Sequence, residues 1–201
     1  MEAPARTNYI FVDYENVQQL DLDLVAGKAV KVFLVVGAQR KNLPLALSKQ
    51  ILKHHDQVQL IESDGASRNA LDLVLAYHVG AAVKADPEGY FHILAKDKDY
   101  DALIQHLQAD KILASRREVF EKIPALIDMR RLSLGERVDW VMERLKKNQA
   151  SRPTRRKTLL SNIHAFCRKE LTEAEVLKIF DTMVQRKMIT VTPPEKIAYS
   201  F

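Results

Sequence analysis

The N-terminal part of the chain alternates between short apolar runs and segments whose apolar residues recur at helical spacing. Parallel strands that are buried on both faces read as continuous apolar runs, and the segments between them are long enough for crossover helices. We therefore predict an α/β, Rossmann-like domain with a central parallel sheet. The predicted strands are Tyr9–Asp13, Val30–Gly37, Gln57–Ile61, Tyr90–Ala95 and a short fifth at Ile112–Ala114.

Three helices are predicted between these strands, and Ser67 is a candidate N-cap for the second. We expect strand order 3-2-1-4-5, in which the order reverses between strands one and four. The apolar faces of the three helices are Leu43, Leu47, Ile51 and Leu52; Leu71, Val74, Leu75, His78 and Val79; and Leu103, Ile104 and Leu107.

The pattern changes in the last third of the chain. A capping box at Ser133 and Glu136 predicts a helix that runs to about residue 147. A polar, basic segment with Pro153 follows, so we place the domains at residues 1–148 and 149–201. The second part shows two helical patterns, the later one opened by a second capping box at Thr172 and Glu175, and then two short β-like runs. This order outlines a small winged-helix-like domain.

Composition adds a charge asymmetry to this picture. Of the 201 residues, 47% are hydrophobic and 28% charged, which indicates a packed core. Residues 146–201 carry a net charge of +7, whereas the other residues carry −2. A basic tail suits a polyanionic partner, and a merely solvated basic surface explains it equally well.

The lone cysteine, Cys167, excludes an internal disulfide framework and a cysteine-based zinc site. We see no secretory signal pattern at the start and no apolar run long enough to span a membrane. We therefore expect a soluble, cytoplasmic protein with no membrane partner. The oligomeric state is open, and a homodimer is compatible with the sequence.

Acidic residues follow the predicted strands at one edge of the sheet. Asp13 ends strand one, and Asp97 and Asp99 follow strand four. In order 3-2-1-4-5 these strands are neighbours, so their acids would meet where open α/β sheets bind ligands. Asp72, on the helix after strand three, can point back toward them. Such carboxylates are the ligand set of a hard divalent cation, Mg²⁺ or Mn²⁺.

Each acid also has a structural alternative. Asp13 could be a turn residue at the strand end, and Asp72 could lie on the surface. Asp99 is either a ligand or the N-cap of the next helix. Asp101 would lie in the first turn of that helix, where the dipole favours it, and we do not count it as catalytic. Tyr14 and Tyr100, beside the acids, could stack on a base, and Tyr14 could equally cap the core.

Three segments together resemble the PIN-like nucleases, specifically the NYN branch. They are a D-x-x-N motif at Asp13–Asn16, a helix carrying Asp72, and a D-x-D-[FY] motif at Asp97–Tyr100. The resemblance covers about residues 8 to 130. It implies metal-dependent hydrolysis of RNA, and sometimes DNA, with Asp13, Asp72, Asp97 and Asp99 as the acidic cluster. Asn16 would orient an acid or bind substrate.

The chain departs from the family pattern before the last motif. Ala95 and Lys96 stand where the family often has Ser/Thr and Gly, and Lys98 separates the two acids. Turned inward, either lysine could pair with the carboxylates and weaken metal binding. Turned outward, either could contact a phosphate.

Basic residues supply candidate substrate contacts. Lys98 is a candidate substrate contact. The residues that could rim the acidic pocket and guide a nucleic-acid strand are Arg40, Lys41, Arg68, Arg116 and Arg117. The tail is similar to the winged-helix modules that accompany some bacterial PIN-like proteins. Its residues suited to phosphates, unless the segment is only a basic linker, are Arg152, Arg155, Arg156 and Lys157.

The leading hypothesis is a nuclease that uses Mg²⁺ or Mn²⁺ and acts on RNA, with DNA as the alternative substrate. The second is a non-catalytic nucleic-acid-binding protein with the same fold, which the two lysines favour. The third, a phosphatase of the haloacid-dehalogenase type, ranks low. That family needs D-x-D at the end of strand one, where this chain has Asp13-Tyr14-Glu15.

Overall fold

The chain consists of two compact units, Met1–Ile127 and Asp128–Phe201. The computed structural model describes residues 6–38, 42–65, 67 and 69–201. The division differs from the predicted one after residue 148. The reason is helix α4 (Leu134–Lys147), which packs against the helices of the second unit rather than ending the first.

The first unit is built on a five-stranded sheet in the predicted order, β3-β2-β1-β4-β5, with all neighbours parallel. Its strands are β1 (Asn8–Asp13), β2 (Val30–Gly37), β3 (Val58–Ser63), β4 (Tyr90–Leu94) and β5 (Leu113–Arg117). β3 and β5 extend beyond their predicted ends because backbone pairing continues through polar residues that interrupt the apolar pattern.

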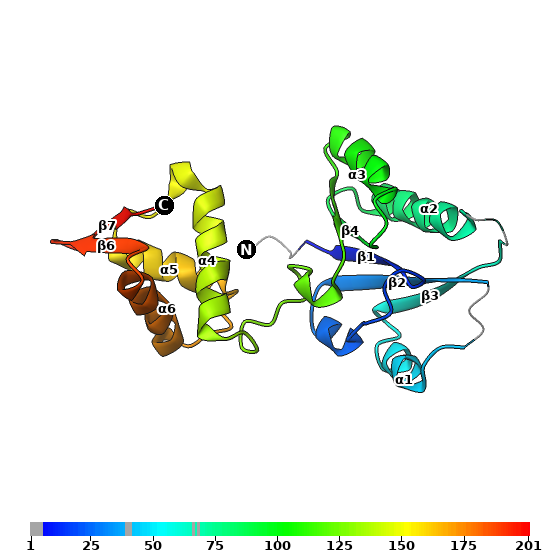
Figure 1. The fold of residues 1–201 in the computed structure, drawn as a ribbon, viewed down its shortest axis with the longest axis horizontal. Coiled ribbons are helices and arrows are strands. Elements are labelled where there is room, and N and C mark those ends of the chain that lie inside the picture. Colours follow the sequence, from blue (N-terminus) through cyan, green and yellow to red (C-terminus); the bar gives the residue numbers. More distant parts are fainter. Residues whose placement is uncertain (1–5, 39–41, 66, 68) are drawn as a thin grey trace. The chain divides into compact units, whose positions relative to one another are not determined.

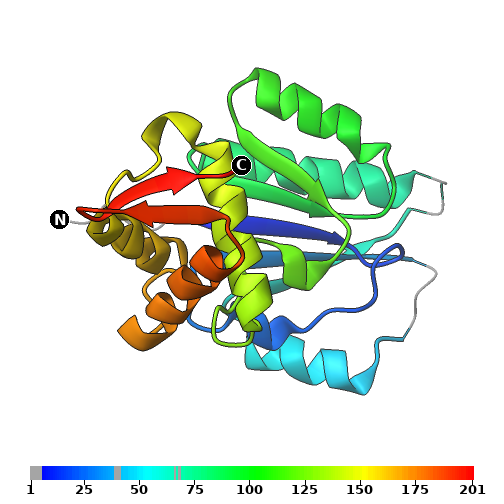
Figure 2. The ribbon, with the colours of Figure 1, turned by 60° about the vertical axis from the view of Figure 1, so that its left-hand side comes forward.

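Helices cover both faces of this sheet (Figures 1 and 2). On one face, α2 (Ala70–Ala85) and α3 (Tyr100–Ala109) close a core with the aromatic residues Tyr9, Phe11 and Phe91. On the other, η1 (Leu22–Val25), α1 (Leu45–Lys53) and η2 (Phe120–Lys122) contribute to a second core. α2 begins after Asn69, so Ser67 is not its N-cap as predicted.

The strand register brings the candidate acids to one edge. Asp13 is the last residue of β1 and pairs with Val35, and Val12 pairs with Leu94 at the end of β4. The loop that carries Asp97 leaves β4 next to the end of β1. The sheet therefore places both segments at its carboxyl edge, where ligands bind in open α/β folds.

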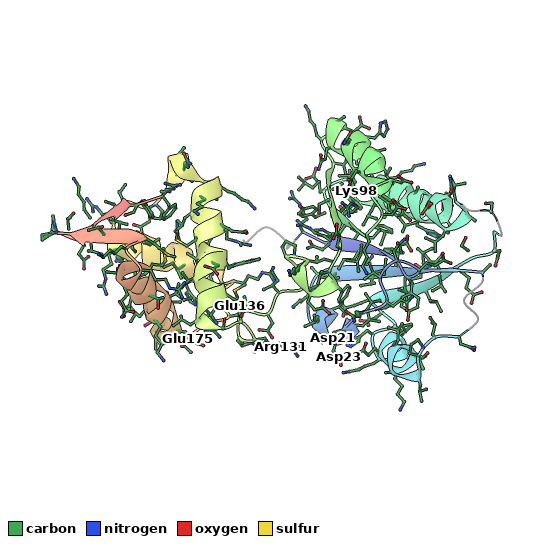
Figure 3. All side chains as sticks on the ribbon, viewed as in Figure 1. Asp21, Asp23, Lys98, Arg131, Glu136 and Glu175 are labelled. Carbon is green, nitrogen blue, oxygen red and sulfur yellow. The ribbon has the colours of Figure 1, made fainter. Side chains whose placement is uncertain are left out.

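The second unit contains α4, α5 (Arg156–Phe166), α6 (Glu173–Gln185) and an antiparallel hairpin of β6 (Ile189–Thr192) and β7 (Lys196–Tyr199), with a short η3 (Gln149–Ser151) after α4. Both predicted capping boxes are present. Glu136 and Glu175, labelled in Figure 3, bond back to Ser133 and Thr172. Three helices followed by a hairpin agree with the winged-helix outline, which stays a prediction. In the described part of the chain, no helix has the length and apolarity to cross a membrane.

Candidate active site

Asp13 is buried and held by local hydrogen bonds. Only 1% of its surface is exposed. Its Oδ1 accepts hydrogen bonds from the backbone N–H groups of Glu15 and Asn16, both at 3.1 Å. The side-chain amide of Asn16 donates to Oδ2 at 2.5 Å. Asp13 is thus the turn residue at the strand end that we considered, and the turn leaves its carboxylate facing the interior of the first unit.

Asp72 meets Asp13 through a third residue. The hydroxyl of Tyr100 donates to Asp72 Oδ1 at 2.5 Å and lies 3.2 Å from Asp13 Oδ2. Tyr100 is the first residue of α3, and Asp72 is in the first turn of α2. The two acids therefore approach each other as predicted, and Asp72 is half-buried rather than on the open surface.

The surroundings of Tyr100 keep its hydroxyl protonated. Burial is the largest cause, followed by the hydrogen bond to Asp72 and the negative charge of Asp13, and together they raise the pKa of Tyr100 above its usual range. Tyr100 is 5% exposed and Tyr14 1%. Neither ring is free to stack on a base, so that prediction is wrong. Tyr14 belongs to the core, as the alternative had it.

The loop from β4 to α3 carries the remaining acids in different roles. Asp97 is exposed, and its Oδ1 accepts the backbone N–H of Asp99 at 2.9 Å. Asp99 occupies the N-cap position of α3, but its exposed side chain makes no capping bond. The carboxylate that binds a free N–H at this helix start is therefore that of Asp97.

Arg116 braces this loop from β5. Its Nε donates to Asp101 Oδ1 at 2.7 Å, and its Nη1 donates to the carbonyl oxygen of Ala95 at 3.1 Å. Nη1 also pairs with Glu118 at 2.9 Å. Only 14% of the Arg116 side chain is exposed. It is a brace rather than a rim residue, and Asp101 is its ion-pair partner rather than a free dipole-favoured acid.

The two lysines of the loop do not point into the acid pair. Lys96 and Lys98 are exposed, and among the described residues neither forms an ion pair. Lys98 lies in the loop before α3 (Figure 3). Lys96 lines a cleft of about 420 Å³ with Asn16 and Glu118. Arg40, Lys41 and Arg68 fall outside the described residues, so their predicted role stays a prediction.

The carboxylates at this edge of the sheet are the groups that could hold a cation. Within the described residues, no three His, Cys, Asp or Glu side chains form a ready group of metal ligands. Two carboxylates, Asp13 and Asp72, do converge on one hydroxyl, and no described cation pairs with them. Mg²⁺ keeps several waters and needs only one or two protein carboxylates, so this pair fits such an ion.

Comparison with known families agrees with this geometry. The family model described as PIN domain (PIN7) matches residues 7–117, more than half of the chain. The chain belongs to the PIN domain family. The match spans all five strands, and it confirms the α/β fold and the PIN-like resemblance. A nuclease-type fold is thereby established for the first unit, whereas the NYN branch stays a prediction. Searches of curated proteins and of solved structures found no match.

Outside the PIN domain, the basic residues of the tail divide into two groups. Arg152 is structural, because it donates to the carbonyl oxygens of Leu145 and Phe201 and stacks on the Phe201 ring. Arg156 pairs with Glu195 and lies over the ring of Phe180. Arg155 and Lys157 are exposed and remain available for a phosphate.

Two residues of the PIN domain site have roles that were not predicted from the sequence. The Tyr100 hydroxyl joins the acids, but the motif position accepts Phe as well, so the sequence does not signal a role for the oxygen. Arg116 was taken for a rim residue because it follows a strand at the carboxyl edge. The available signal was the opposite charge of Asp101, in the first turn of the helix that leads into β5.

Proposed function

We propose that the protein is a metal-dependent nuclease that hydrolyses phosphodiester bonds of RNA in preference to DNA. The observation that carries the proposal is the approach of Asp13 and Asp72 at the carboxyl edge of a PIN-domain sheet. Buried acids without a basic partner are unfavourable in a folded protein unless a cation or hydrogen-bond donor meets them. Their cost to folding is consistent with a role in chemistry.

Asp13 and Asp72 are the residues proposed to hold Mg²⁺ or Mn²⁺. Asp97 and Asp99, at the same edge, are proposed to complete the acidic site once substrate and cation are present. Such a cation, when bound, orients phosphate oxygens and makes a bound water more acidic. The side-chain amide of Asn16 donates a hydrogen bond to Asp13, and its contribution is to fix the orientation of the Asp13 carboxylate.

The cleft beside Asn16 and Lys96 is proposed to take the strand next to the scissile phosphate. Its lining also includes amide and carboxylate side chains that can hydrogen-bond to bases. Lys96 and Lys98 would contact phosphates from the exposed side of the loop. The complete lining is Asn16, Val17, Gln18, Gln19, Lys96, Glu118, Val119 and Glu121.

The second candidate is a non-catalytic nucleic-acid-binding protein with the PIN fold. It is favoured by the arrangement of the acids, since the described residues hold a pair of carboxylates rather than a group of three. In that case the exposed Lys96, Lys98, Arg155 and Lys157 would bind the backbone without cleavage.

Cleavage of labelled single-stranded RNA separates the two candidates. We expect the wild type to cleave in Mn²⁺ and not in EDTA, and Asp72→Asn to lose activity by about 100-fold or more, because a ligand carboxylate is removed. A matched single-stranded DNA should be cleaved more slowly. The control is Asp110→Asn, an exposed acid at the far end of α3, which should behave as the wild type.

RNA binding without cleavage by the folded wild type would instead support the non-catalytic candidate. Equal cleavage by Asp72→Asn and the wild type would remove Asp72 from the site.

A further inference from the structure

One hydroxyl group serves two carboxylates in the PIN domain. Tyr100 Oη lies 2.5 Å from Asp72 Oδ1 and 3.2 Å from Asp13 Oδ2. A tyrosine hydroxyl carries a single hydrogen, so it donates fully to only one of two acceptors. The shorter distance assigns that hydrogen to Asp72. The hydroxyl oxygen of Tyr100 and Oδ2 of Asp13 then lie next to each other, and the hydroxyl hydrogen does not lie between them.

The other hydrogen-bond donors of Asp13 are neutral groups, so they do not balance the charge of its carboxylate. Its Oδ1 is engaged by two backbone N–H groups, and its Oδ2 by the neutral amide of Asn16. Among the described residues, no Lys, Arg or His pairs with Asp13 or Asp72. The two carboxylates and the hydroxyl oxygen therefore carry more negative charge than the one shared hydrogen balances, so they attract a cation.

We propose that the Tyr100 hydroxyl is a placeholder for a divalent cation. It links Asp13 and Asp72 while no cation is bound, and it gives up its bond to Asp72 when a cation takes both carboxylates. The inference rests on the proposed function and assigns Tyr100 a positioning role within that site. Tyr100 sets how strongly the two acids bind the ion, and it takes no part in bond cleavage.

The position of the ring makes this competition unavoidable. Tyr100 belongs to the same buried cluster as Leu71, Leu75 and Ile104, which holds its ring beside the two acids. The Mg–O distance is about 2.1 Å, so two oxygens on one Mg²⁺ lie roughly 3 to 4 Å apart. The hydroxyl oxygen occupies the short gap between the two carboxylates that such an ion needs.

Loss of the hydroxyl should therefore favour the ion. Removing the hydroxyl costs the cation-free state its charge-assisted hydrogen bond. The cation-bound state has already given up that bond, so it loses nothing. The difference appears as tighter binding, since affinity reports the gap between the two states. A hydrogen bond to a charged group accounts for about a tenfold change or more in the dissociation constant.

The test compares Tyr100→Phe with a matched variant in the same unit. Tyr9 is also buried and donates its hydroxyl to a carboxylate, Asp86, at 3.0 Å, but at the start of β1. Mn²⁺ is titrated into each full-length protein without nucleic acid, and binding is measured by calorimetry. We expect Tyr100→Phe to bind Mn²⁺ about tenfold more tightly than the wild type and Tyr9→Phe to bind equally.

A second measurement needs no variant. With tyrosine labelled at the ring carbon that carries the hydroxyl, Mg²⁺ should shift the NMR signal of Tyr100 and leave that of Tyr9 in place. The two signals are assigned by through-bond correlation to the backbone of the wild type. This arm holds even if Tyr100→Phe folds poorly, which circular dichroism would reveal.

The outcomes separate this inference from the proposed function. Equal or weaker Mn²⁺ binding by folded Tyr100→Phe, or an unmoved Tyr100 signal in a wild type that binds Mg²⁺, overturns the placeholder role alone. A wild type that binds no divalent cation and cleaves nothing overturns both. Metal-dependent cleavage with unchanged affinity in Tyr100→Phe leaves the nuclease standing and removes the placeholder.

Discussion

At the scale of single residues, the buried side chains of Asp13, His54 and His92 in the PIN domain have hydrogen-bond partners, whereas the buried Ser63 hydroxyl has none among the described residues. Asp13 combines two roles that the sequence presented as alternatives, because the bonds that make it a turn residue also fix its carboxylate. His92 is the other fully buried ionisable group of the sheet. Its ring nitrogens contact Ser115 Oγ and Asn8 Oδ1, both at 3.1 Å.

His92 should make the protein less stable in acid. Burial, followed by the positive charge of Arg117, lowers the pKa of His92 to about 3 from the usual 6.5. The unfolded chain therefore takes up a proton that the folded one refuses. The stabilising contribution of neutral His92 is complete above about pH 6.5 and is lost progressively as the pH falls toward 3. Between pH 7 and 4.5, the urea midpoint should fall more in the wild type than in His92→Gln.

Exposed His106 on α3 provides the comparison for that measurement. His106→Gln should leave the acid sensitivity of the wild type intact. An equal loss of stability in wild type and His92→Gln would show that other groups control the acid response.

At the scale of elements, the strands and their order were predictable, whereas the braces between elements were not. Each strand of the PIN domain contains an apolar run, and the expected order is a common one among doubly wound parallel sheets. Arg116 and the Tyr100 hydroxyl act across elements that are far apart in the chain, and a single sequence holds no record of those distances. The membership of α4 was missed for the same reason.

Two glycines should respond oppositely to alanine. Gly80 lies within α2, and an added Cβ would meet no atom within 4 Å. Gly80→Ala should therefore stabilise the protein by about 1 kcal/mol, the difference in helix propensity. A Cβ on Gly89 would lie 2.8 Å from the Tyr9 ring and 3.0 Å from that of Phe91. Gly89→Ala should cost roughly 1–3 kcal/mol, because packed rings would have to move.

Urea unfolding of both glycine variants checks this prediction. A stabilised Gly89→Ala would mean that the two rings move freely, and a destabilised Gly80→Ala would mean that the exposed side of α2 is covered by another surface.

At the scale of the whole molecule, two units with separate cores imply two separable stabilities. Cys167 lies in the second unit and is fully buried, and burial raises the pKa of its thiol to about 11. A buried thiol of this pKa reacts only when the surrounding structure opens. Cys167 is therefore a natural reporter for the unfolding of residues 128–201.

Core deletions in the two units should affect that reporter differently. Ile163 and Ile10 are both fully buried, in the second and first units respectively. Each change to Ala removes about 2–5 kcal/mol from its own core. Ile163→Ala should accelerate the labelling of Cys167 by a thiol reagent at least tenfold, and Ile10→Ala should not. Equal acceleration by both would show that the units unfold together.

The spacing of the site along the chain has a consequence for protein synthesis. The Tyr100 hydroxyl contacts partners 87 and 28 positions earlier, and the loop before it is tied to β5 by Arg116. A growing polypeptide on the ribosome therefore has no assembled acid pair until β5 has emerged and docked beside β4. A chain truncated before that point carries every acid of the site without the contacts that bring Asp13 and Asp72 together.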